Sequence, residues 1–469
     1  MKGTRPHARA TITPKGERAL LAGHPWVYEA EVERLEPATG AVAGTAGAAG
    51  IRGAADAPDA QPPAADSSGC DIPNGSLVDV LSRKGAYLGT ALISHRSKIR
   101  LRLITRNAND RFDAAFWRRK VQWAWDYRVQ AMGKDATDPE AGCRIVFGEA
   151  DGFPGLVVDR FADVLVTQTL TVGMERLKST IFPLLREVLA ASGVAIRGIY
   201  ERNDVSIRKL EGLEETCGWF APAAGPGSEG LPPGTAGAPD AAGTPGPAAL
   251  AAPTFTQIIE NGVRYHVDFE HGQKTGFFLD QKYNRAAVAR LARGRRVLDC
   301  FTHTGSFALN AAAGGAKFVR AVDVSELAIA QARENAQLNG LEDKMAFTAA
   351  NVFDLLPQLE GTRDERYDFI ILDPPAFTKS RKTIDAAAHG YKEINYRALR
   401  LLPRGGYLAT CSCSHFMDVE RFRRMMVSAA HDAGVQLRQI EERQQAPDHP
   451  IVWGISETDY LKFFLFQVV

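Results

Sequence analysis

The chain has 469 residues, of which 45% are apolar and 24% charged, and its formal net charge is +1. This length exceeds that of one typical domain, so we expect two to four compact units, and the composition excludes a globally disordered chain. No run of about 18 apolar residues predicts a membrane helix. The first residues, MKGTRPHARATITPKGER, contain no apolar stretch typical of a secretion signal, so we expect a cytoplasmic protein.

The cysteines are scattered along the chain. They form no Cys-x-x-Cys pair and have no histidine at zinc-like spacing, which argues against a disulfide framework or a metal site. The six are Cys70, Cys143, Cys217, Cys300, Cys411 and Cys413.

Two segments of Ala, Gly, Pro and small polar residues, 37–69 and 221–253, divide the chain. Such compositions bury too little side-chain area to offset the entropy of ordering, so we predict a mobile insertion and a mobile linker. We therefore predict a small β-rich unit over 1–105 that contains the insertion. A central α/β unit follows over 106–220 and a C-terminal α/β unit over 254–469.

The first two units show short alternating patterns and helical periodicity. Strands are predicted over 77–81, 87–93, 99–104, 156–158 and 164–169, and helices over 116–129 and 175–192. Residues 94–120 hold nine Lys or Arg against two Asp, with Arg100 and Arg102 alternating on one strand face. Such a segment can neutralise RNA phosphates or can be a solvated face, and both interpretations stay open.

Beyond residue 256 strands and helices alternate, which is typical of a parallel α/β sheet. A strand over 295–301 carries Asp299, and a second strand over 319–323 ends on Asp323. At the carboxyl edge of such a sheet, an acid after the second strand can bind a ribose diol. Because only Gly305 stands in the first turn, the dinucleotide fingerprint is absent, and we favour a nucleoside cofactor without pyrophosphate over NAD.

A third strand, over 367–372, delivers Asp373 at its carboxyl end, and Pro374, Pro375 and an aromatic residue follow. The two prolines lack N–H donors and lock the backbone, so they make a stiff wall beside whatever Asp373 contacts. Methyltransferases hold a flat base with this arrangement. The pattern therefore favours an S-adenosylmethionine-dependent methyltransferase but does not identify the atom that is methylated.

The fourth strand carries two thiols, Cys411 and Cys413, near its carboxyl end. Carbon 5 of a pyrimidine becomes nucleophilic only when a thiolate adds to carbon 6, whereas methylation of an amine or a ring nitrogen needs no thiol. A free cysteine is more often a small buried apolar residue. Here Cys413 should emerge at the same sheet edge as Asp373 and lies beyond Cys411, so we favour Cys413 as the nucleophile.

At these residues the chain resembles the bacterial large-subunit rRNA cytosine-C5 methyltransferases (RlmI-like), over almost its whole length outside the two low-complexity segments. Further motifs that carry the resemblance lie at 24–27, 148–156, 200–204, 271–281 and 448–450. The resemblance implies a PUA RNA-binding domain, a central α/β domain and a class I, Rossmann-like methyltransferase domain. It also implies a soluble enzyme that acts on 23S rRNA or a large-subunit precursor, with a homodimer as an open alternative.

The resemblance also implies roles for individual residues. Cys413 matches the nucleophile of a Ser-Cys-Ser motif, and Asp373 matches an acid that pairs with the base and protonates its ring nitrogen. Asn351 stands where an Asp is usual, and Cys411 stands where an apolar residue is expected. The residues implied for S-adenosylmethionine binding are Asp299, Phe301, Thr304, Gly305, Asp323, Asn351 and Asp373.

Two other functions stay open at this point. A guanine or adenine nitrogen methyltransferase also uses an Asp-Pro-Pro-aromatic loop, and full activity of a Cys413→Ala variant would favour it. A non-catalytic rRNA-binding assembly factor could keep the same fold, and failure to bind S-adenosylmethionine would favour that alternative.

Overall fold

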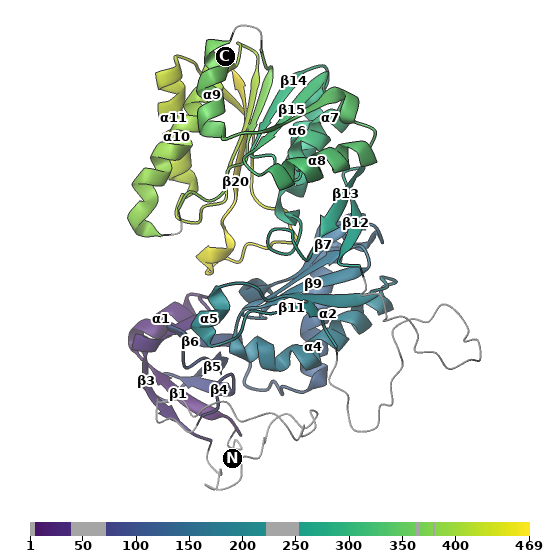
Figure 1. The fold of residues 1–469 in the computed structure, drawn as a ribbon. Helices are drawn as coiled ribbons and strands as arrows, with labels where there is room; N and C mark the ends of the chain where they lie inside the picture. Colours follow the sequence, from purple (N-terminus) through teal and green to yellow (C-terminus); the bar gives the residue numbers. More distant parts are fainter. Residues whose placement is uncertain (1–4, 39–71, 222–252, 363–364, 379) are drawn as a thin grey trace, which may run out of the picture.

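A computed structural model describes residues 5–38, 72–221, 253–362, 365–378 and 380–469. The insertion predicted over 37–69 and the linker predicted over 221–253 lie almost wholly outside these residues. Figure 1 shows the C-terminal unit, in green and yellow, standing on the middle unit, with the purple N-terminal unit beside the middle unit at the bottom.

The N-terminal unit is a six-stranded sheet with the strand order β2-β6-β5-β4-β1-β3. Its strands are β1 (Ala8–Ile12), β2 (Trp26–Tyr28), β3 (Val32–Glu36), β4 (Leu77–Leu81), β5 (Tyr87–Ile93) and β6 (Ile99–Thr105), and its helix is α1 (Pro14–Leu21). The predicted strands over 77–81 and 87–93 are confirmed with the same bounds, and the one over 99–104 extends by one residue. Alternate residues of β1 and β4 enter its small core, as a half-buried sheet requires.

The middle unit is a five-stranded sheet in the order β11-β10-β9-β8-β7. Its strands are β7 (Gly142–Phe147), β8 (Leu156–Phe161), β9 (Val164–Thr169), β10 (Gly198–Arg202) and β11 (Cys217–Trp219), and its helices are α2 (Ala114–Met132), α3 (Lys134–Thr137), α4 (Val172–Ala191) and α5 (Ile207–Glu211). Apolar residues of α2 and α4 pack with one face of the sheet into a single core that contains Trp117 and Trp125. Both predicted helices are confirmed but begin two or three residues earlier.

The C-terminal unit is a seven-stranded sheet in the order β16-β15-β14-β17-β18-β20-β19. Its strands are β14 (Arg296–Cys300), β15 (Phe318–Asp323), β16 (Met345–Ala349), β17 (Phe369–Leu372), β18 (Tyr407–Ser412), β19 (Leu437–Arg443) and β20 (Lys462–Val468). The first five are parallel, and β20 runs antiparallel to both of its neighbours.

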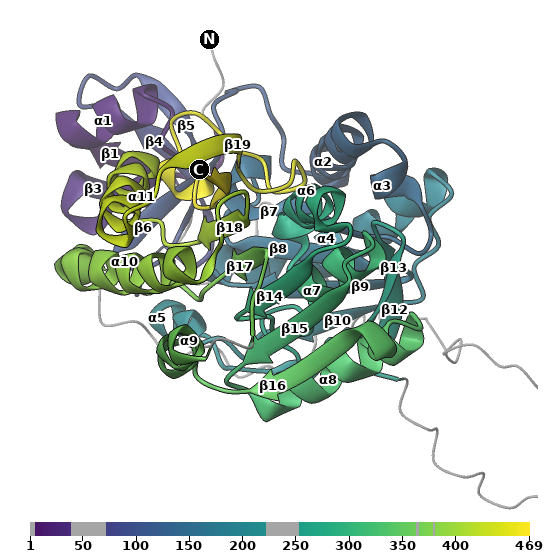
Figure 2. The ribbon, with the colours of Figure 1, turned by 90° about the horizontal axis from the view of Figure 1, so that it is seen from above.

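Helices cover both faces of this sheet (Figure 2). Those of the unit are α6 (Lys282–Ala292), α7 (Ser306–Ala313), α8 (Glu326–Leu338), α9 (Val352–Gly361), α10 (Ile384–Leu401) and α11 (Val419–Ala433). Successive strand residues alternate between two cores: Val297 packs with α6 and α7, whereas Leu298 packs with α9, α10 and α11. Because both faces are buried, the strands read as apolar runs, as parallel sheets do.

A hairpin of β12 (Phe255–Glu260) and β13 (Val263–Asp268) lies between the middle and C-terminal sheets (Figure 1). Its Tyr265 and Val267 belong to a core that also contains Val166 of β9 and Val297 of β14. The middle and C-terminal units therefore share one continuous apolar core. None of the helices described by the structure is both long enough and apolar enough to cross a membrane.

Candidate active site

The candidate site lies where the strand order of the C-terminal sheet reverses. Strand β14 pairs with β15 on one side and with β17 on the other, because the chain first builds outward to β16 and then returns. In such sheets ligands bind at the carboxyl ends of the strands on either side of this point. Asp299 in β14 and Asp373 after β17 are brought to this edge, as predicted.

The loop after β14 is held in an unusual backbone conformation. Phe301 and His303 have φ angles of +64° and +51°, although neither is glycine, and Gly305 follows at +85°. A Cβ on Gly305 would lie 3.0 Å from the Cβ of Ala332 in α8, so the loop passes too close to that helix for a side chain. Left-handed residues cost energy and persist where packing enforces them, commonly at ligand sites.

Asp299 is fully buried beneath this loop. Its Oδ2 accepts hydrogen bonds from the Thr302 hydroxyl at 2.5 Å and the Ala308 N–H at 2.9 Å, whereas its Oδ1 has no partner among the described residues. Burial raises the pKa of Asp299 to about 7. The buried hydroxyl of Thr304 also lacks a partner there. A buried polar atom without a partner is costly, so these atoms point to a ligand that supplies one.

Asp323 ends β15, as predicted, and is half-buried. One carboxylate oxygen accepts the His303 N–H at 2.9 Å and the other accepts the Ser325 N–H at 3.0 Å, so the carboxylate fixes the loop after β14. Asn351 is exposed after β16, where its side-chain oxygen accepts the Phe353 N–H at 3.1 Å and caps α9. That hydrogen bond leaves the Asn351 amide N–H groups available as donors.

Asp373 contacts a residue to which the sequence assigned no role. The Nε2 of Gln281, in the short helix η3 (Leu279–Gln281), donates to Oδ1 of Asp373 at 3.0 Å. Asn284 in turn donates to the Gln281 Oε1 at 2.6 Å and fixes the amide. Burial, followed by the charge of Asp280, raises the pKa of Asp373 to about 7. The polar pair Asp280-Gln281, directly after the apolar residues 277–279, is the sequence signal that could have identified Gln281.

Both thiols lie beside Asp373. Cys411 is fully buried within β18 opposite Phe463, and burial raises its pKa well above the ordinary value. Cys413 lies just beyond the strand, with its Sγ 3.9 Å from the carbonyl oxygen of Pro374. Burial and then the charge of Asp373 raise the Cys413 pKa to about 11, and Lys274 and Lys462 oppose this rise. The expectation that Cys413 emerges at the edge occupied by Asp373 is confirmed.

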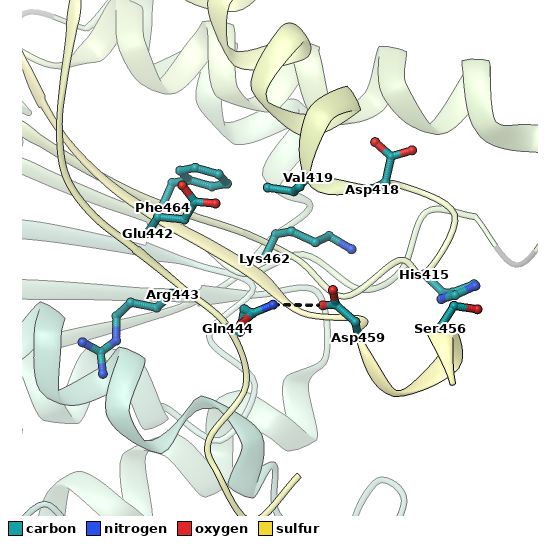
Figure 3. Close-up of a pocket in the computed structure, with 10 residues that line it drawn as sticks. All are labelled: His415, Asp418, Val419, Glu442, Arg443, Gln444, Ser456, Asp459, Lys462 and Phe464. Atoms are coloured by element: carbon teal, nitrogen blue, oxygen red, sulfur yellow. Dashed lines mark hydrogen bonds between the residues drawn. The ribbon is translucent and has the colours of Figure 1, made fainter. Parts of the chain in front are cut away.

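A cavity of about 300 Å³ lies beside the Cys413 segment and is drawn in Figure 3. Lys462 of β20 stands opposite Ser412 and reaches into it, with Nζ donating to the carbonyls of Ser414 at 2.7 Å and Tyr460 at 2.8 Å. Burial lowers the Lys462 pKa to about 8. The buried Nδ1 of His415, which also lines the cavity, has no partner among the described residues.

The strand face of Arg100 and Arg102, for which the RNA-binding and the solvated interpretations both stayed open, has its two arginines paired inside the protein. Arg100 donates to the Ser94 carbonyl at 3.0 Å and pairs with Glu29. Arg102 is buried and pairs with Glu211 of α5 at 2.9 Å. Residue alternation cannot show this pairing, because Glu211 belongs to the middle unit. The exposed basic residues of the segment are Arg96, Lys98, Arg106, Arg111, Arg118 and Arg119.

Comparison with known families matches two parts of the chain. Residues 248–466 match the family described as S-adenosylmethionine-dependent methyltransferase, and residues 10–48 and 63–106 match the family described as PUA-like domain. The chain is 35% identical over 460 residues to the ribosomal RNA large subunit methyltransferase I of Yersinia pestis (bv. Antiqua, strain Angola). That match covers 98% of this chain and 99% of the relative, and the Yersinia pseudotuberculosis protein (serotype I, strain IP32953) matches equally.

Solved structures share the whole architecture. An S-adenosylmethionine-dependent methyltransferase structure from Streptococcus mutans superposes with a TM-score of 0.70 at 20% identity, covering 98% of this chain and all of that one. A second structure with the same TM-score and identity is a methyltransferase in complex with SAH. These structures confirm the predicted fold of an N-terminal β-rich unit, a central α/β unit and a Rossmann-like unit.

Proposed function

This chain belongs to the ribosomal RNA large subunit methyltransferase I family, and from that premise we propose that it methylates carbon 5 of a cytosine in 23S rRNA. It is an S-adenosylmethionine-dependent methyltransferase. The observation that supports this target atom is the thiol of Cys413 beside the carboxyl group of Asp373, at the edge where a base would meet the cofactor. We place this reaction in the cytoplasm, on rRNA or a large-subunit precursor.

The residues at the point where the strand order reverses, between β14, β15 and β17, fit S-adenosylmethionine. The cofactor supplies an electrophilic methyl group and carries an ammonium group, a ribose diol and an adenine that need polar partners. Asp299 Oδ1 and the Thr304 hydroxyl are buried and unpartnered among the described residues, so they offer such partners. Asp323 retains free lone pairs for the diol, Asn351 has free amide donors for the adenine edge, and Phe301 and Gly305 shape the loop.

Cys413 is the proposed nucleophile. Its thiolate adds to carbon 6 of the cytosine, and the electron pair of the 5,6 double bond becomes available at carbon 5. After methyl transfer to carbon 5, a base removes the carbon-5 proton, the bond between Cys413 and carbon 6 breaks, and the double bond re-forms. The target base must leave its stack to reach this site.

Asp373 is suited to act as the acid that faces the base. With a pKa of about 7 it is partly protonated at neutral pH, so it can donate to the ring nitrogen that gains electron density when Cys413 adds. Its ionised form raises the pKa of Cys413. A neutral Asp373 therefore favours both the thiolate and the hydrogen bond to the base, and the ammonium of Lys462 favours the thiolate further.

The test uses a large-subunit rRNA transcript that contains 5-fluorocytidine. Fluorine on carbon 5 cannot leave as a proton, so the thioether should accumulate as a protein–RNA adduct that survives denaturing electrophoresis. Cys413→Ala should lose both the adduct and turnover. Cys411→Ala is the matched control two residues earlier, and it should keep most of the adduct and of the turnover. An adduct that depends on Cys411 instead would move the nucleophile, and unchanged activity of both variants would favour a nitrogen methyltransferase.

A further inference from the structure

One aromatic side chain stands almost completely in solvent. Trp453 is 95% exposed and occupies the apex of a turn in which the Ile455 N–H donates to the Val452 carbonyl at 2.9 Å. Gly454 follows it with a φ of +101°, as the third position of a tight turn often requires. Tryptophan is enriched at interaction surfaces, because its large ring and its indole N–H can both be used there.

The backbone beneath Trp453 is anchored on both sides. The Val452 N–H donates to the Thr458 hydroxyl at 3.0 Å, and the Ala446 N–H donates to the Asp280 carbonyl at 2.7 Å. Buried Arg128 of α2 donates to the Asp448 carbonyl at 2.8 Å. The ring is therefore held out by a fixed loop, so little backbone entropy is lost when a ligand covers it.

Trp453 belongs to the segment between β19 and β20, which is yellow in Figure 1 and reaches down towards the N-terminal unit. A Cβ on Gly454 would lie 2.9 Å from the Ala22 carbonyl oxygen, so the two backbones are in contact. Glu457, in the helix η6 (Ser456–Thr458), lies 3.6 Å from His24. The same helix contributes Ser456 to the cavity that Lys462 enters (Figure 3). Trp453 thus stands between the PUA-like unit and the cavity beside Cys413.

The chemistry of the Trp453 side chain favours recognition of a base over recognition of a phosphate. The indole ring carries no positive charge, and the nearby cavity is lined by three acidic residues as well as by the cations Arg443 and Lys462. Every nucleobase has a π-face that an aromatic ring can stack on, whatever its sequence. RNA enzymes that extrude a base commonly hold neighbouring unstacked nucleotides in this way.

We propose that Trp453 is a stacking platform for an unpaired nucleobase of the RNA, next to the cytosine that enters the site of Cys413. This inference rests on the proposed function, since it assumes an RNA substrate. A platform at this position keeps the single strand continuous between the PUA-like unit and the catalytic edge. It reads no base identity, so it sets the affinity for unpaired RNA rather than the choice of sequence.

The experiment compares wild type with Trp453→Ala, Trp453→Phe and Trp123→Ala. Trp123 is the matched control, because it is 61% exposed on α2, and within the described part of the chain its ring contact is with Arg119. With a fluorescein-labelled 12-nucleotide single-stranded RNA, Trp453→Ala should bind about 5- to 100-fold more weakly, as expected for one lost base stack. Trp453→Phe should stay within a few-fold of wild type, and Trp123→Ala should equal wild type.

Further measurements test whether lost base stacking is the cause of the weaker RNA binding of Trp453→Ala. The slope of log Kd against log salt should not change in Trp453→Ala, because stacking neutralises no phosphate. The KM for rRNA should rise while S-adenosylmethionine affinity, measured by calorimetry, stays equal to wild type. Equal RNA affinity of Trp453→Ala and wild type would overturn the proposal that a base stacks on Trp453. A protein partner would then be the candidate that covers this ring. If wild type itself transferred no methyl group to rRNA, the proposed function would fail instead.

Discussion

The N-terminal basic segment and the carboxyl edge of the C-terminal sheet differ in whether their polar groups have partners inside the protein. Arg100 and Arg102, which looked available for RNA, donate to carbonyls and pair with carboxylates inside the protein. Asp299 and Thr304, at the sheet edge, keep buried atoms without a partner among the described residues. The paired arginines hold the structure together, whereas the unpartnered buried groups at the carboxyl edge of this sheet fit a site whose hydrogen bonds a ligand completes.

The largest effect is expected for the paired arginines of the N-terminal basic segment. Arg102→Gln should lower the free energy of unfolding by about 3–5 kcal/mol, because Glu211 would remain buried without its cation. Urea denaturation measures the change. Arg100→Gln is the control, since its partner Glu29 is mostly exposed and such pairs contribute about 1 kcal/mol or less. Equal effects of the two substitutions would show that Arg102 is not a structural residue.

The next effect concerns the buried acid of the sheet edge. The pKa of Asp299 is raised in the folded state, so its contribution to stability is full below the unfolded pKa near 4 and is lost as pH rises through about 7. Asp299→Asn removes this dependence. Between pH 5 and pH 8 the unfolding free energy of the variant should gain about 2–3 kcal/mol relative to wild type. Urea denaturation without cofactor measures both proteins at both pH values. The same difference in unfolding free energy between variant and wild type at pH 5 and pH 8 would contradict this prediction.

A smaller effect is expected for the cofactor. If Asp323 holds the ribose diol, Asp323→Ala should weaken S-adenosylmethionine binding by about 1–3 kcal/mol, the effect of removing a hydrogen-bonding partner from a bound polar group. Titration calorimetry measures it. Asp354→Ala, an exposed acid on α9, is the control and should bind as wild type does. Unchanged affinity of Asp323→Ala would remove this residue from the cofactor site.

The smallest effect separates exposed from paired cations in the basic segment. Lys98 is exposed, so Lys98→Gln should lower the slope of log Kd against log salt for single-stranded RNA by about 1 if it contacts one phosphate. Arg100→Gln should leave that slope unchanged, because Arg100 is already paired with Glu29. A lower slope in the Arg100 variant would favour the RNA-binding interpretation of this strand face.

Local patterns were sufficient for much of the fold. The strand Tyr87–Ile93 was predicted with its bounds because alternation ends at a turn on one side and at polar residues on the other. The helix α2 was predicted too short. Its true ends are set by Asp113, whose side chain accepts the Phe116 N–H, and by Gly133 at a φ of +58°, and apolar periodicity does not report such caps.

In the site, the sequence alone could place only the residues at the carboxyl ends of the parallel strands. Asp373 and Cys413 were predicted to meet because parallel strands end at one edge. Gln281 reaches Asp373 across 92 residues of chain, from a short helix outside the sheet. Lys462 approaches Cys413 because β20 runs antiparallel to β18 in a register that sets it opposite Ser412. Long-range register and loop packing determine both contacts, and no local pattern encodes them.

The continuous core beneath the hairpin β12–β13 has a consequence for modularity. Apolar residues of β9, of the hairpin and of β14 fill one interior, so the middle and C-terminal units are not interchangeable building blocks. A fragment that starts at residue 254 would present Tyr265 and Val267 to water and would be prone to aggregate. Recombination between relatives should therefore keep the middle and C-terminal units, residues 106–469, together as one inherited block.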